Sequence, residues 1–91
     1  MRVSADPEDR DYSPIADRLQ VRLNGVPVPT CISADEERGE VLMYDVDSRG
    51  WMCISKSYWY GCVEILVDPR AAPAERVLGA KELVEKYRVK D

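Results

Sequence analysis

The segment Leu19–Thr30 constrains the fold of this chain more than any other stretch, because it contains the dipeptide Asn24-Gly25. Asn-Gly suits a two-residue type I′ turn, in which both central residues have a positive φ. A hairpin around this turn aligns apolar residues on one face and places Pro27 and Pro29 on the other. In this register the backbone at positions 27 and 29 points away from the partner strand. Proline has no N–H, so it costs the hairpin no hydrogen bond and prevents a further strand from pairing on that side. The segment therefore predicts an edge hairpin in a mainly β domain.

Further strand-like segments follow this hairpin and are separated by turn sequences. We expect strands at 41–46, 51–55 and 62–67. Asp47–Gly50 is typical of a hairpin turn with a G1 bulge. We expect residues 31–40 to form an acidic connection and residues 56–61 to form a turn. The sequence thus predicts an antiparallel meander of about five strands, arranged as a small barrel or a strongly twisted sheet.

The two ends of the chain differ from its middle. Residues 1–17 are rich in Asp and Glu and contain two prolines, which predicts a flexible acidic N-terminal arm. Residues 18–91 predict a single small β domain with a C-terminal helix at about 74–89. Leu83 and Tyr87 lie on the apolar stripe of this helix. Two arrangements stay open: the helix covers its own sheet, or it docks on another subunit.

Charge and composition argue against several classes of function. The chain has 13 Lys and Arg residues, 17 Asp and Glu residues and no His, which gives a net charge of −4. This argues against direct binding of nucleic acid, because non-specific affinity depends on a basic surface. Without His or a C-x-x-C pair, the usual zinc ligand sets and His-assisted nucleophiles are missing. We therefore predict no enzyme, no metal and no cofactor.

The cysteines and the apolar runs bear on the compartment. Cys31, Cys53 and Cys62 are odd in number and stand in apolar segments, which is typical of buried, reduced thiols in an intracellular protein. The N-terminus does not resemble a signal peptide. The longest apolar runs are about four residues and fall far short of a membrane span. We expect a soluble cytoplasmic protein without membrane contact.

Two features are candidate sites for a protein partner. Tyr58, Trp59 and Tyr60 cannot all face inward from a regular strand, and aromatic residues dominate interface hot spots. Acidic residues form the second candidate, a patch for a basic partner. These residues are Asp35, Glu36, Glu37 and Glu40. In the alternative reading, which stays open, the aromatic residues fill the core and the carboxylates are simply solvated.

Three stretches share their layout with a known group of proteins. They are Val21–Val28 around the Leu-Asn-Gly turn, Ala34–Val41 with the sequence Ala-Asp-Glu-Glu-Arg-Gly-Glu-Val, and Gly61–Val67. This layout resembles short proteins encoded by tailed phages and prophages, in which an LNG hairpin precedes an ADEExGxV segment and a closing strand. The resemblance covers residues 19–67. It implies a phage origin and a role in particle assembly or in interference with the host, and it implies no catalytic residues.

Three functions stay open at this point. The first is a non-enzymatic phage-type accessory or structural protein that binds a protein partner or itself, in the host cytoplasm or in the virion. The second is an inhibitor of a host nucleic-acid machine, an anti-defence protein that presents the acidic residues to a basic groove. The third is a small barrel that binds single-stranded nucleic acid through Trp51, Tyr58 and Trp59.

Overall fold

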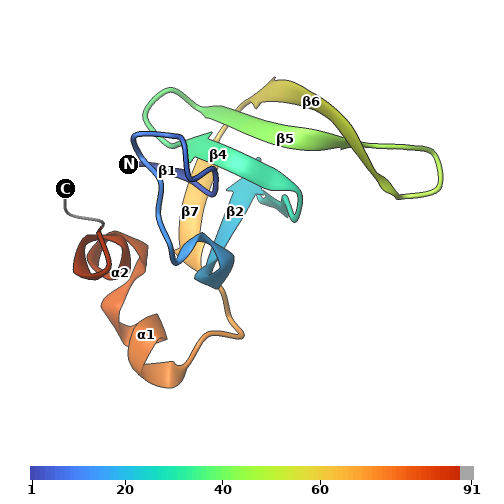
Figure 1. Cartoon of the computed structure of the whole chain (residues 1–91). Coiled ribbons are helices and arrows are strands. Elements are labelled where there is room, and N and C mark those ends of the chain that lie inside the picture. Colours follow the sequence, from blue (N-terminus) through green and yellow to red (C-terminus); the bar gives the residue numbers. More distant parts are fainter. Residues whose placement is uncertain (89–91) are drawn as a thin grey trace.

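A computed structural model describes residues 1–88 and shows a mainly β chain with two antiparallel sheets (Figure 1). The first sheet has four strands in the order β1-β4-β5-β6, and the second has three in the order β3-β2-β7. The strands are β1 Arg2–Ser4, β2 Leu19–Leu23, β3 Val26–Pro27, β4 Cys31–Asp35, β5 Glu40–Val46, β6 Met52–Tyr60 and β7 Val63–Val67. The helices are a 3-10 turn at Ala16–Arg18, α1 at Pro73–Leu78 and α2 at Ala80–Lys86.

The Asn24-Gly25 hairpin is confirmed. Asn24 and Gly25 have φ values of 52° and 82°, as a type I′ turn requires. Leu23 pairs with Val26, and the N–H of Val28 donates to the carbonyl oxygen of Val21 at 2.8 Å. β3 lies at the edge of its sheet, which is the position that the two prolines predicted.

The predicted five-strand meander is wrong, because β7 does not pair with β6. It pairs along its whole length with β2, from Leu19 opposite Val67 to Leu23 opposite Val63. The strands therefore divide into two sheets, and the described residues form no closed barrel. Cys31–Asp35, expected in a connection, is a central strand between β1 and β5. The turn expected at 56–61 is absent, because β6 continues beside β5 as far as Tyr60.

The N-terminal segment, predicted to be an arm outside the domain, belongs to the first sheet. β1 pairs with β4, and the chain then folds back so that the N–H of Ser4 donates to Asp11 and the N–H of Ser13 donates to Ser4. The Arg2 guanidinium makes two hydrogen bonds of 2.7 Å to Asp9 and one to Asp11. Two of the acidic residues that suggested a solvated arm, Asp9 and Asp11, thus neutralise a cation on β1.

The core lies between the two sheets, and α2 covers one side of it. Its buried side chains are Val3, Val21, Ala34, Val41, Val63 and Ile65. Leu83 is fully buried, while Ala80 and Val84 of the same helix pack against this core. Gly79 divides the predicted helix into α1 and α2. The end predicted for this helix, residue 89, lies outside the described residues. No helix in the described part of the chain has the length and apolarity to cross a membrane.

The two sheets are joined at a tight crossing between β6 and β7, which consists of Gly61 and Cys62. The N–H of Gly61 donates to Gly39 at 3.0 Å, and the N–H of Asn24 donates to Cys62 at 2.8 Å. The N–H of Cys62 donates in return to Oδ1 of Asn24 at 2.9 Å. The β4–β5 turn, the β2–β3 turn and the crossing therefore hold one another in place.

Substitution of Gly39 by Ala should destabilise the chain more than substitution of Gly25. Both glycines have positive φ, which costs an L residue about 1 to 2 kcal/mol. A Cβ on Gly39 would also lie 2.5 Å from the Gly61 carbonyl oxygen, whereas a Cβ on Gly25 meets nothing. We expect the free energy of unfolding in urea to fall by roughly 1 to 3 kcal/mol more for Gly39→Ala. Equal losses would contradict the crossing described above.

Asp9→Asn should lower the free energy of unfolding by about 1 kcal/mol at neutral pH, since the pair with Arg2 is partly screened by solvent. The hydrogen bonds from Arg2 hold the pKa of Asp9 well below its usual range. This stabilisation is therefore present above the unfolded-state pKa of about 3.9 and is lost as the pH falls further.

In denaturation curves at a series of pH values, the difference between the wild type and Asp9→Asn should shrink below about pH 4. Glu8→Gln, which removes an exposed carboxylate from the same turn, serves as the control and should change little. A difference that stays constant with pH would show that Asp9 acts by packing and not by charge.

Candidate functional site

The β5–β6 hairpin, residues 40–60, is here called the ribbon. Its base belongs to the four-stranded sheet, because residues 40–43 also pair with β4, and its far end extends from the body of the domain as two strands (Figure 1). Seven large hydrophobic side chains on it are exposed: Val46, Trp51, Met52, Ile54, Tyr58, Trp59 and Tyr60. Ile54 is 96% exposed. Elsewhere in the described chain, only Val26, Val77 and Tyr87 are comparably large and exposed. Such a concentration of exposed apolar side chains on one element is typical of interaction sites.

The ribbon is exposed because the core ends beneath β5. Val41 of β5 is fully buried, but Trp59, directly opposite on β6, is 54% exposed. No residue of β6 is buried, since the second sheet supports the first one only as far as β5. A strand of mainly apolar residues is thus held in place mainly by its backbone pairing with β5.

Neighbouring residues of β6 face opposite sides of the sheet. On one side Lys56 lies opposite Tyr44, with its Nζ 5.7 Å from the centre of the Tyr44 ring, and Tyr58 lies opposite Leu42. On the other side the hydroxyl of Ser57 donates to Asp45 at 2.6 Å and lowers the pKa of that carboxyl. Lys56 is the single charged residue of β6. Both faces are therefore mainly apolar or neutral.

β6 also presents an open backbone edge. It is the terminal strand of its sheet, so only one of its edges pairs with β5. The N–H of Gly61 points to Gly39 on the β5 side. Because backbone groups alternate along a strand, those of Lys56, Tyr58 and Tyr60 point away from β5. These groups can form hydrogen bonds with an added strand.

The structure places the predicted aromatic triplet on the surface, with Tyr58, Trp59 and Tyr60 all more than half exposed. Trp51 lies in the ribbon turn, at the opposite end of β6 from the triplet, and is also exposed. The sequence reasoning missed Met52 and Ile54, because it assigned 51–55 to a strand of a small barrel or strongly twisted sheet. The available signal was the near-continuous apolar run Trp51–Ile54, which has no polar face and therefore requires cover on both sides.

The predicted acidic patch is largely used within the chain. Asp35 accepts the N–H groups of Glu37 and Arg38 at 3.0 and 3.1 Å. Glu36 accepts the N–H of Ile65 on β7 at 3.1 Å. Glu40 is half-buried at the start of β5, and only Glu37 is exposed. The four carboxylates therefore do not form one free surface.

The predicted helix residues lie apart from the ribbon, on the other side of the domain (Figure 1). Leu83 is fully buried within the chain, which gives it a role in the core. Tyr87 lies at the surface with the Arg18 guanidinium 5.7 Å and the Lys86 ammonium 5.4 Å from its ring centre. The helix therefore covers its own sheet in this structure.

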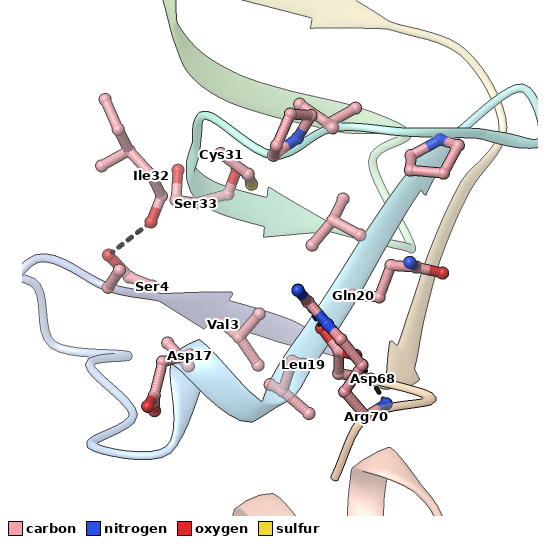
Figure 2. Close-up of a pocket in the computed structure, with 16 residues that line it drawn as sticks. Val3, Ser4, Asp17, Leu19, Gln20, Cys31, Ile32, Ser33, Asp68 and Arg70 are labelled. Carbon is pink, nitrogen blue, oxygen red and sulfur yellow. Dashed lines mark hydrogen bonds and ion pairs between the residues drawn. The ribbon is translucent and has the colours of Figure 1, made fainter.

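A cavity of about 410 Å³ opens between the two sheets (Figure 2). Leu19 and Val28 form part of its apolar lining, Cys31 lies in its wall, and Arg70 pairs with Asp68 at 3.3 Å beside it. Burial raises the pKa of the Cys31 thiol to about 11, so this cysteine is neither a ready nucleophile nor a ready metal ligand. Within residues 1–88, no group of three or more Cys, Asp or Glu side chains could hold a metal ion.

Among the described surfaces, the ribbon alone combines a large exposed apolar area with an open backbone edge, and it is the candidate functional site. The cavity has a charged pair at its side but offers no reactive group. No protein-family model, curated protein or solved structure matches the chain.

Cys31 should react far more slowly with iodoacetamide than the exposed Cys62. With a pKa of about 11, roughly one Cys31 thiol in a thousand is ionised at about pH 8. Its alkylation rate should rise about tenfold for each pH unit up to about pH 10. Peptide mass spectrometry at timed intervals measures both rates. In urea the two cysteines should become similar, whereas equal rates in the folded chain would contradict the environment described for Cys31.

Proposed function

We propose that this chain is a non-enzymatic binding module that holds another polypeptide on the β5–β6 ribbon. The observation that carries this proposal is the group of seven exposed hydrophobic side chains on a ribbon that no part of the described chain covers. Trp and Tyr supply large contact areas at low conformational cost and are enriched at the centre of protein interfaces.

The ribbon also fits a known mode of recognition, in which an extended segment adds a strand to an exposed sheet edge. Main-chain hydrogen bonds to the outward groups of Lys56, Tyr58 and Tyr60 would supply affinity. The side chains on both faces of β6 would supply specificity, since alternate residues of the added strand pack against them.

The resemblance of residues 19–67 to tailed-phage and prophage proteins extends this proposal to a biological role. We infer a component of particle assembly, or a protein that interferes with the host, acting in the host cytoplasm or in the virion. Inhibition through an acidic surface has less support, because Asp35 and Glu36 already accept backbone hydrogen bonds within the chain.

Binding of single-stranded nucleic acid also has less support than protein binding. Bases stack on aromatic side chains inside a positively charged groove. Here Tyr58 and Trp59 face opposite sides of β6, and Lys56 is the single cation of the strand. The outcome of the following test separates the two classes of partner.

Ile54→Asp should lower association with a protein partner at least about tenfold, because it puts a charge into an apolar contact surface. The side chain is almost fully exposed in the free chain, so the fold should be unaffected. The measurement is cross-linking of the tagged, purified chain in a cell lysate, followed by quantification of cross-linked proteins, including further copies of the chain.

Val77→Asp is the matched control, since Val77 is 87% exposed but lies on α1, away from the ribbon. It should cross-link as the wild type does. Equal behaviour of the two variants would overturn the ribbon as the binding site. Retention of the wild type on a poly-dT oligonucleotide, lost in Ile54→Asp, would assign the ribbon to nucleic acid instead.

A further inference from the structure

We propose that the polypeptide held by the ribbon is a second copy of this chain, with β6 paired antiparallel to β6 across a two-fold axis. The two four-stranded sheets would then become one continuous sheet. This inference rests on the proposed function and names its partner. Its basis is a difference between β6 and the other three sheet edges of the molecule.

Each of those three edges carries an obstacle to an added strand. β3 carries Pro27, and Pro29 follows it, so N–H donors are missing there. β1 has three residues and is covered by the returning chain, which bonds to Ser4. On β7 the outward N–H of Ile65 is taken by the Glu36 carboxylate. Such devices are how proteins prevent pairing between sheet edges.

β6 has almost none of this protection. It is the longest strand, with nine residues, and it contains no proline and only one charged residue. A long, apolar, unprotected edge is a template for pairing with another strand. Since the chain obstructs three edges and leaves this one open, the open edge is the one that is used.

A second copy matches β6 in backbone pattern and in charge. An antiparallel arrangement about a two-fold axis presents the same outward N–H and C=O groups from both strands. With the axis at Ser57, Lys56 of one copy lies opposite Tyr58 of the other, and Ile54 lies opposite Tyr60. The ammonium group then faces an aromatic ring and not a second ammonium group. β6 has no acidic residue that would require a basic partner.

The exposed apolar side chains of β6 also supply contact area at the paired edge. In the register above, Ile54 packs against Tyr60 of the other copy on one face of the sheet, and the residues on the other face meet in the same way. Antiparallel pairing would also place the ribbon turn of each copy, with Trp51 and Met52, beside the base of the other copy's β6. This would cover apolar residues at both ends of the strand.

The test is the solution mass of the full chain by sedimentation velocity over a concentration series. We expect the wild type to be a dimer of about 21 kDa, twice the 10.3 kDa of one chain. Two substitutions at one position then test the register. Tyr58→Lys places a second cation opposite Lys56 and should weaken the dimer at least about a hundredfold. Tyr58→Glu places an anion there, so the dimer should persist at low salt and weaken as salt is added.

Amide hydrogen exchange supplies a readout at the edge itself. In the dimer the N–H groups of Lys56, Tyr58 and Tyr60 should exchange at least about tenfold more slowly than in the diluted monomer. Tyr58→Pro should abolish dimerisation without disturbing β5, because it removes an N–H that points outward. Circular dichroism checks that this variant folds, and the Lys and Glu variants give an independent result if it does not.

A wild type that stays monomeric at about 100 μM, a concentration at which interfaces of the usual size are occupied, would overturn copy pairing. Copy pairing would also be overturned by a dimer that Tyr58→Lys and Tyr58→Glu weaken equally. The same holds for a dimer in which the amides of Lys56, Tyr58 and Tyr60 exchange as fast as in the monomer. If the chain is monomeric but Ile54→Asp still removes cross-links to other proteins, copy pairing fails and protein binding on the ribbon stands. If Ile54→Asp has no effect either, both proposals fail.

Discussion

The crossing at Gly61 and Cys62 is the constraint on which the rest of this structure depends. Between Tyr60 and Val63 the chain leaves one sheet and enters the other, within two residues. A Cβ on Gly39 would lie 2.5 Å from the Gly61 carbonyl oxygen, and a Cβ on Gly61 would lie 2.6 Å from Oδ1 of Asn24. Asn24 also donates its N–H to Cys62 and accepts the N–H of Cys62. Because β7 must begin here, it falls beside β2. β6 is then left without a neighbour on its outer edge.

The sequence predicts the parts of this fold that depend on local chemistry. Asn24-Gly25 gives the observed hairpin, because a type I′ turn has strict φ requirements that few residues meet. Asp47–Gly50 likewise forms a tight turn, with a positive φ at Gly50. The pairing of β2 with β7 joins residues 40 to 48 positions apart, and no local pattern specifies it. The acidic residues 9 and 11 suggested a solvated arm, because their partner Arg2 becomes close only through β1.

The candidate site was predictable in part for a similar reason. Alternation along a strand shows that Tyr58, Trp59 and Tyr60 cannot all be buried, which requires no knowledge of the fold. The exposure of Met52 and Ile54 depends on whether a second sheet lies beneath β6, and only the strand order reveals that none does. Asp35 and Glu36 each accept a backbone N–H within the chain, and composition does not reveal these hydrogen bonds.

The same crossing has a mechanical consequence. A ribbon that grips a partner experiences force whenever that partner moves, and a flexible tether would let the ribbon swing. Here the ribbon is anchored at its base by the bonds of Gly61 to Gly39 and of Cys62 to Asn24. Tension along β6 therefore passes directly into β7 and is shared by its five-residue pairing with β2. A partner held on the ribbon, as proposed above, would therefore take its orientation from the domain.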